Sequence, residues 1–148
     1  KVNGVGGVVM KNVAVAGEAG VRELHISVDS HNHSLLKVEK GDEGEKGFSE
    51  SGAVKKVNTT TLQQIFLKNN LARVSLVKMD CEGAEFEILK STPVEVLQKI
   101  GAFYIEYHKY EGNDPGVLRR ILEKAGFKVE MKESFYDKRF GFVWARLL

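Results

Sequence analysis

Residues 75–89 read Ser75-Leu76-Val77-Lys78-Met79-Asp80-Cys81-Glu82-Gly83-Ala84-Glu85-Phe86-Glu87-Ile88-Leu89. A short apolar run stops here at a group of acidic residues around one glycine. The pattern predicts a buried strand over 75–79, of the kind found in parallel sheets covered on both faces, followed by a helix. Open α/β sheets bind their ligands beyond the carboxyl ends of such strands. Asp80 and Glu82 are therefore predicted to lie at a ligand site.

Downstream of this stretch, helix and strand signals alternate. Thr61, Thr92 and Asp114 each precede an apolar helical stripe, and each is predicted to cap its helix. Between and after these helices the sequence predicts strands over 102–107, which ends at His108, and over 127–133 and 140–148. The last two strands are joined by a link too short for a crossover helix, which predicts an antiparallel pair.

Upstream, the signals are weaker. Val8 to Ala16 and Val21 to Val28 are predicted as strands. Residues 37–56 are rich in Gly, Glu, Lys and Ser and are predicted to form a flexible loop, either a lid over the site or a solvated surface excursion. The glycines around Gly6 precede a strand-like run, whereas a nucleotide-binding loop follows a strand, so a phosphate loop is not predicted there.

Length and composition fit one domain. The chain has 148 residues, of which 43% are hydrophobic and 28% charged, enough to bury a core. The net charge of +2 gives no electrostatic footprint, so neither nucleic acid nor a membrane is predicted as a partner. A single cysteine excludes an internal disulfide. With no apolar run long enough for a membrane span and no signal segment at its start, the chain is predicted to be cytoplasmic.

Three segments resemble the FkbM family of S-adenosylmethionine-dependent methyltransferases. Lys78-Met79-Asp80-Cys81-Glu82-Gly83-Ala84-Glu85 is similar to the family's K-I-D-x-E-G-A-E run at the end of the fourth strand. Val57 to Leu71 resembles its T-L-D-D-L-L helix, with Gln63 and Gln64 in place of the acidic pair. Tyr104 to His108 resembles its E-x-H strand end. Together they cover about the last two thirds of the chain.

The resemblance implies an α/β fold, the C-terminal part of a Rossmann-like class I methyltransferase doubly wound sheet with a terminal antiparallel hairpin. The family's strand order is 3-2-1-4-5-7-6, and Val8 to Ala16 resembles its third strand. The glycine-rich cofactor loop and the acidic residue after the second strand are absent. We therefore expect residues 1–148 to form a single FkbM-like domain that is N-terminally truncated, with one edge of the strand over 75–79 exposed unless a homodimer, a rearrangement or a missing N-terminal half fills the gap.

The implied reaction assigns roles to the residues at the strand ends. Methyl transfer to oxygen needs an aligned acceptor hydroxyl and a group that takes its proton. His108 is predicted as the base, because an imidazole of pKa about 6.5 can accept a proton at neutral pH. Asp80 is predicted to act in catalysis by holding the acceptor hydroxyl, or to hold the amino group of the cofactor S-adenosylmethionine. Glu82, Gly83 and Glu106 are predicted to bind cofactor or substrate, and Glu82 and Glu106 could instead orient His108.

A metal site is a further hypothesis. Asp80, Glu82 and Glu106 can supply oxygen ligands to a divalent cation such as Mg2+. His31 and His33 alone are too sparse for a metal site, and a loop is the favoured interpretation.

Structural interpretations of the same residues stay open. Gly83 permits a tight turn, Glu82 and Glu85 suit the positive end of a helix, and His108 can be an ordinary loop residue. Glu87 is interpreted as a solvated helix residue. Cys81 is interpreted as a small buried filler.

Three functions remain. The first is a methyltransferase that acts on a hydroxyl of a sugar, a polyketide or a similar small-molecule acceptor. The second is a non-catalytic remnant or interaction domain of the same fold. The third is a metal-dependent hydrolase built on the three acidic residues Asp80, Glu82 and Glu106.

Overall fold

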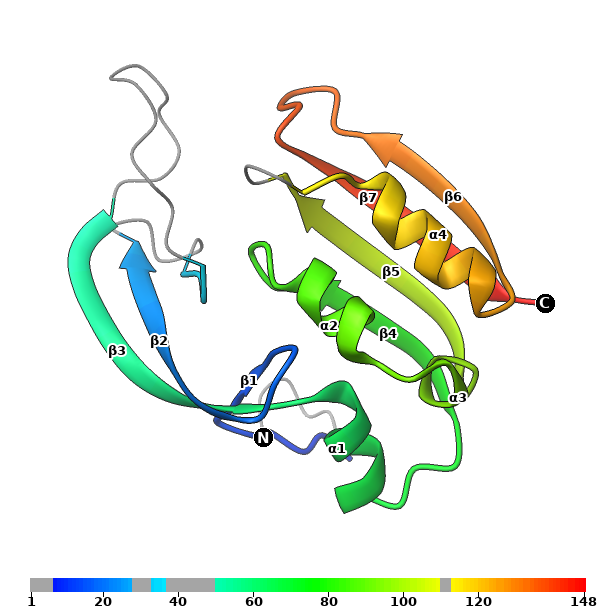
Figure 1. The fold of residues 1–148 in the computed structure, drawn as a ribbon, viewed down its shortest axis with the longest axis horizontal. Helices are drawn as coiled ribbons and strands as arrows, with labels where there is room; N and C mark the ends of the chain where they lie inside the picture. Colours follow the sequence, from blue (N-terminus) through cyan, green and yellow to red (C-terminus); the bar gives the residue numbers. More distant parts are fainter. Residues whose placement is uncertain (1–6, 28–32, 37–49, 110–112) are drawn as a thin grey trace.

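The computed structural model describes residues 7–27, 33–36, 50–109 and 113–148, and their strands form two separate sheets (Figure 1). The smaller sheet has the order β1-β3-β2 and consists of β1 (Ala14–Val15), β2 (Gly20–Ser27) and β3 (Glu50–Thr60). β2 and β3 are antiparallel, and β1 pairs in parallel with the end of β3.

The larger sheet has the order β4-β5-β7-β6, and its strands are β4 (Val74–Asp80), β5 (Ile100–His108), β6 (Phe127–Glu133) and β7 (Phe140–Leu147). β4 and β5 are parallel, and β7 runs antiparallel to both β5 and β6. The predicted antiparallel pair at the end of the chain is thus confirmed. The parallel register places Asp80 beside Glu106, so the carboxyl ends of β4 and β5 meet at one edge.

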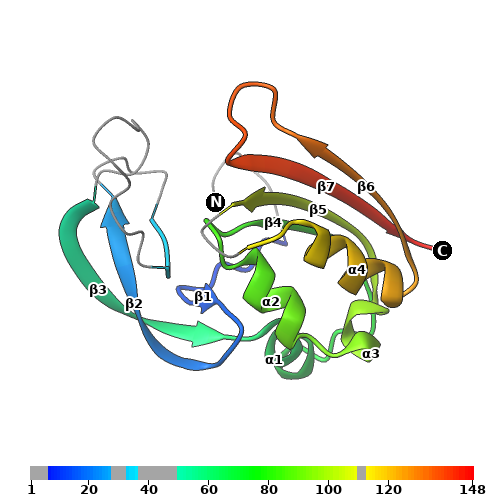
Figure 2. The ribbon, with the colours of Figure 1, turned by 45° about the horizontal axis from the view of Figure 1, so that its top comes forward.

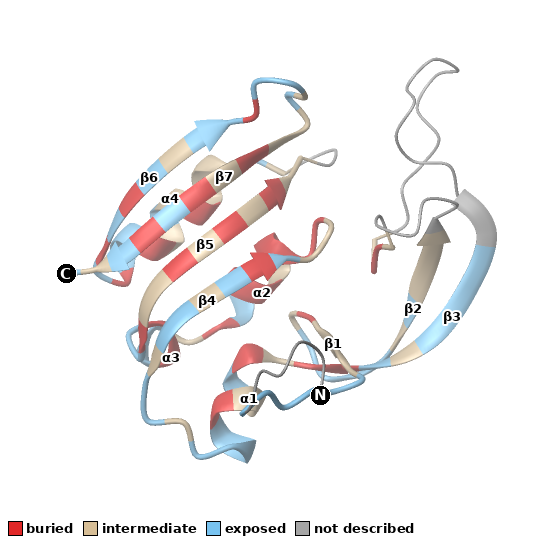
Figure 3. Cartoon of the chain, turned by 180° about the vertical axis from the view of Figure 1, so that it is seen from behind, coloured by how far each residue is buried: buried red, intermediate tan, exposed pale blue. Residues whose placement is uncertain are grey.

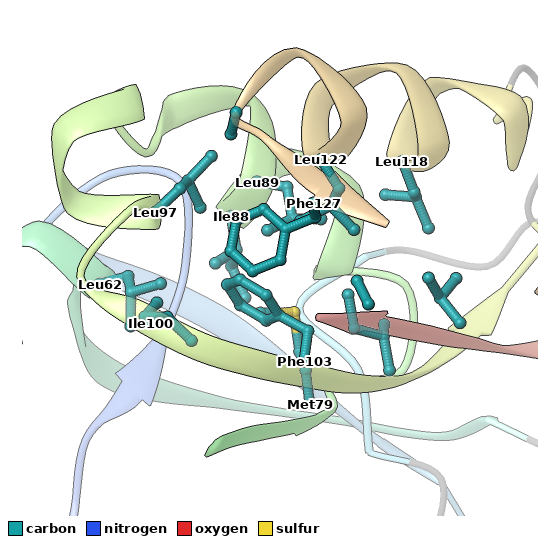
Figure 4. Close-up of a cluster of buried hydrophobic side chains, with 14 of the residues drawn as sticks. Leu62, Met79, Ile88, Leu89, Leu97, Ile100, Phe103, Leu118, Leu122 and Phe127 are labelled. Atoms are coloured by element: carbon teal, nitrogen blue, oxygen red, sulfur yellow. The ribbon is translucent and has the colours of Figure 1, made fainter. Parts of the chain in front are cut away.

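The helices are α1 (Leu62–Lys68), α2 (Glu85–Ser91), α3 (Val94–Leu97) and α4 (Gly116–Lys124). α2 and α4 cover one face of the larger sheet (Figure 2), and the core fills the space between them and the strands. At its centre the rings of Phe103 and Phe127 have centroids 5.5 Å apart and lie among Leu89, Leu118 and Leu122 (Figure 4). None of the helices in the described ranges is long and apolar enough to cross a membrane.

β4 differs from the predicted buried strand. Met79 points into the core and is 4% exposed, whereas Leu76 on the opposite face is 49% exposed. Figure 3 shows this face, on which Tyr104 packs edge-to-face against Trp144, itself 44% exposed. The prediction was wrong because an apolar run does not reveal whether one face or both will be covered, and the described residues cover only one. β4 lies at the edge of the sheet, in line with the expected exposed edge.

The start of the chain also departs from the sequence predictions. Of the loop predicted over 37–56, residues 37–49 lie outside the described residues, but 50–56 belong to β3, as do Val57 to Thr60 of the predicted helix. β-branched residues at 54, 57, 59 and 60 favour this strand, and β2 pairs with it along most of its length. Of the strand predicted over 8–16, only Ala14–Val15 is a strand.

The predicted helix caps are partly confirmed. The Thr61 side chain accepts a hydrogen bond from the backbone N–H of Gln64 at 3.2 Å, as a cap should. Asp114 Oδ1 accepts from Gly116 N at 2.8 Å at the start of α4. Thr92 is not a cap, because its hydroxyl donates to the Ile88 carbonyl at 2.6 Å, and Pro93 holds the N-cap position of α3.

Candidate functional site

The site is built on the turn between β4 and α2. Asp80 ends β4, and the chain then passes through Glu82 with φ 48° and Gly83 with φ 99° before α2 begins at Glu85. Positive φ values are readily adopted by glycine, which explains why Gly83 follows Glu82 at this turn. The Ser34 hydroxyl donates to the Glu82 carbonyl at 2.6 Å and ties the turn to the segment beside β2.

Glu85 holds this turn from inside the protein. Its side chain is 0% exposed, and its carboxylate accepts hydrogen bonds from Cys81 N at 2.7 Å and from Gly83 N at 2.9 Å. The sequence suggested only an electrostatic role at a helix end. The spacing could have indicated this role, because a glutamate two residues after the glycine of a strand-to-helix turn can accept hydrogen bonds from the N–H groups of that turn.

His108 ends β5 and lies between two of these acids. Its Nδ1 is 3.3 Å from Glu85 Oε1, and its Nε2 is 3.5 Å from Glu82 Oε2. The imidazole is 13% exposed, the Glu82 side chain is 16% exposed, and the ring of Phe140 stacks beside the imidazole at 6.3 Å. The structure therefore brings the predicted base together with Glu82 and with an acid that had no predicted catalytic role.

Burial alone would lower the pKa of His108. The hydrogen bond to Glu85 and the negative charges of Glu85, Glu82 and Asp80 outweigh burial and raise the pKa above its usual value. For Glu82, burial raises the pKa and the charge of His108 opposes this effect. The neutral imidazole of His108 is consequently a stronger base than a free one.

Asp80 and Glu106 lie beside this pair. Asp80 is paired with Lys78 at 2.5 Å, its side chain is 35% exposed, and the hydrogen bond raises the pKa of Lys78. His108 contacts Glu82 and Glu85, and the suggestion that Glu106 orients it stays a prediction. Glu106 remains a neighbour of Asp80 in the sheet.

The structure changes the set of residues proposed as metal ligands. In the described part of the chain, Asp80, Glu82 and His108 offer ligand atoms within 4.8 Å of one another, and Glu106 is not in this group. Mg2+ prefers oxygen ligands, and replacing a carboxylate by an imidazole makes the set less suited to it. Metal binding stays a prediction.

A cavity of about 310 Å3 opens between the two sheets, next to the turn. Its walls are mostly aliphatic, with acids from the turn at one side, and comprise Ala14, Val15, Leu24, His33, Leu35, Asp80, Cys81, Glu82 and Ala84. Burial, reinforced by the charge of Glu85, raises the pKa of Cys81 to about 11, so its thiol stays protonated, in line with the filler interpretation. His31 lies outside the described residues.

Arg22 from β2 links the side of the cavity formed by Leu24 and Leu35 to α2. It pairs with Glu87 at 2.6 Å and donates to the Leu35 carbonyl at 3.3 Å. Glu87 was interpreted from the sequence as a solvated residue, but its side chain is 33% exposed and forms an ion pair that links α2 to β2. Sequence spacing gave no signal for it, because the two residues are far apart in the chain.

The pH dependence of stability should reflect the raised pKa of His108. Such a group stabilises the fold fully below its unfolded pKa of about 6.5, and this contribution is lost as pH rises through the folded pKa. We expect the free energy of unfolding, measured by urea titration, to fall as the pH rises above about 6.5. The fall should be smaller in His108→Gln, and equal slopes in both proteins would contradict the assignment.

Comparison with known proteins gives one match. The sequence profile of the Methyltransferase FkbM domain matches residues 5–129, which is more than half of the chain and includes Asp80, Glu82, Glu85 and His108. No curated protein and no solved structure matches the chain.

Proposed function

The chain belongs to the FkbM methyltransferase domain family, and on this basis we propose that it transfers a methyl group from S-adenosylmethionine to a hydroxyl of a sugar, a polyketide or a similar small metabolite. The observation that carries the proposal is the position of His108. Its ring lies between Glu82 and Glu85, beside the acids that line the cavity. This arrangement suits a base that acts on a bound hydroxyl.

The residues around the cavity fit one end of the cofactor. Asp80 and Glu82 are negatively charged groups beside aliphatic walls, which suits the cationic amino and sulfonium groups of S-adenosylmethionine. When bound, S-adenosylmethionine supplies an activated methyl group on a positively charged sulfur. Within residues 7–27, 33–36, 50–109 and 113–148 no glycine-rich loop lies between a strand and a helix, so these residues fit the amino-acid end of the cofactor and not its nucleoside.

His108 takes the proton in this proposal. The neutral imidazole would accept the hydroxyl proton as the acceptor oxygen took up the methyl group that bound S-adenosylmethionine would supply. The carboxylates of Glu82 and Glu85 then stabilise the imidazolium that forms. Asp80, at the cavity wall, would hold either the acceptor hydroxyl or the cofactor's amino group.

The size of the cavity supports a small acceptor. Pockets for small molecules commonly enclose about 300–1,000 Å3, and this one is near the lower limit. A small-molecule acceptor fits such a volume better than a macromolecular acceptor would.

We would test the proposal by incubating the 148-residue chain with S-adenosylmethionine and a panel of hexoses, sugar nucleotides and hydroxylated polyketides. S-adenosylhomocysteine should form only when a suitable acceptor is present. Calorimetric titration with S-adenosylhomocysteine should show binding to the same chain. A folded chain that gives neither heat nor product would contradict the proposal and favour the interaction-domain alternative. Loss of turnover in EDTA, restored by Mg2+, would support the metal hypothesis.

A further inference from the structure

We propose that Glu85 is a positioning residue for His108. By accepting a hydrogen bond from Nδ1–H, its carboxylate holds the neutral ring in the tautomer that has its lone pair on Nε2, the nitrogen that faces Glu82. The use of this lone pair as a base rests on the proposed function, whereas the tautomer itself does not.

The surroundings of Glu85 place the shared proton on the histidine. Both carboxylate oxygens already accept backbone N–H groups, from Cys81 and from Gly83, and a backbone N–H can only donate. A carboxylic acid also gives up its proton at a lower pH than an imidazolium does. The contact of 3.3 Å between Glu85 Oε1 and His108 Nδ1 is therefore a hydrogen bond that the ring donates.

Fixing Nδ1–H decides what the other nitrogen can do. In histidine, the hydrogen bond made by one ring nitrogen sets the protonation of the other. Nε2 lies 3.5 Å from Glu82 Oε2, at the limit of hydrogen-bond distance, whereas Nδ1 is closer to Glu85 at 3.3 Å, so the single proton of the neutral ring is placed on Nδ1. In the opposite tautomer Nε2 would carry a proton and could not accept one from a bound hydroxyl.

The same carboxylate also shapes the backbone on both sides of Glu82. Its two backbone donors, Cys81 and Gly83, are the residues that flank Glu82, which has a positive φ of 48°. Glu85 thus sets the position of the Glu82 backbone and the orientation of the His108 ring together. This buried side chain, 0% exposed, would fix the geometry of the base without touching the substrate.

The direct test is nitrogen NMR on the 148-residue chain with 15N-labelled histidine, at a pH above the pKa of His108. The sequence contains four histidines, and the signal that disappears in His108→Gln identifies the relevant ring. We expect a protonated, pyrrole-type Nδ1 and an unprotonated, pyridine-type Nε2. The reverse pattern in the native protein would overturn the proposal, and this readout needs neither cofactor nor activity.

A matched pair of variants tests the cause. In Glu85→Gln the side-chain amide can donate to Nδ1, so the proton should move to Nε2, and kcat should fall about 10²-fold or more while S-adenosylhomocysteine binding is kept. Glu87→Gln, two residues further on and paired with Arg22, should keep the native tautomer. An unchanged tautomer in folded Glu85→Gln would overturn the proposal. If that variant does not fold, the nitrogen NMR spectrum of the native chain still tests the proposal by showing which ring nitrogen of His108 is protonated.

The two proposals fail separately. A ring with Nδ1 protonated in a chain that transfers no methyl group would leave the positioning role of Glu85 intact and remove the proposed function. Methyl transfer by a chain whose neutral His108 has its proton on Nε2 would support the proposed function and remove the positioning role of Glu85.

Discussion

Replacing His108 with glutamine is expected to reduce turnover by about 10²–10⁴-fold, the usual contribution of a general base. Glutamine approximates the size of imidazole and reaches the place of Nε2, but its amide cannot accept a proton at neutral pH. The site around it should persist, because Glu85 still holds the turn through Cys81 N and Gly83 N. The measurement is the rate of S-adenosylhomocysteine formation with the best acceptor from the panel.

His108→Asn is the matched control for the contact with Glu85. Its shorter amide lies near the place of Nδ1 and can still donate to Glu85, so this variant should be at least as stable as His108→Gln and equally inactive. Both variants should bind S-adenosylhomocysteine as the native chain does, which would separate proton transfer from cofactor binding. Turnover within threefold of the native rate in both variants would remove His108 from the mechanism.

Replacing Phe103 with alanine is expected to lower the free energy of unfolding by about 3–5 kcal/mol. The side chain is 0% exposed and contacts Phe127 at the centre of the core that joins α2 and α4 to the sheet. Small domains are stable by only about 5–15 kcal/mol, so the change should be evident in urea-induced unfolding.

Phe135→Ala is the control for this core substitution. The same aromatic side chain is removed, but Phe135 lies after β6 and is 86% exposed. Its free energy of unfolding should stay within about 0.5 kcal/mol of the native value. Equal losses in the two variants would mean that Phe103 is not part of the core described here.

The sequence predicted the part of the site that depends on local pattern. An apolar run, an acid and a glycine at 75–83 indicated a strand that ends in a tight turn, and the structure has β4 and that turn. The meeting of His108 with Glu82 followed from placing the ends of two parallel strands side by side. Both inferences needed only short segments and one rule of sheet geometry.

Other features depend on contacts between distant segments, and local pattern missed them. The sequence predicts a loop over the first part of β3 because charged residues are interspersed with its β-branched ones. Its strand structure depends on pairing with β2, which local sequence does not reveal. The ion pair of Arg22 with Glu87 joins a strand of the smaller sheet to helix α2. The role of Glu85 was missed because a buried acid at a helix start looks, in sequence, like a surface acid at the same place.

The cavity between the sheets has a consequence for engineering. Its acids come from residues 80–82, but its aliphatic far wall comes from β1, β2 and the segment at 33–35. A graft of residues 74–148 into another scaffold would transplant the acids and His108 with only part of the cavity lining. The lining of the cavity is thus divided between two parts of the sequence, and exchanging the smaller sheet alone would change its aliphatic wall while keeping its acids.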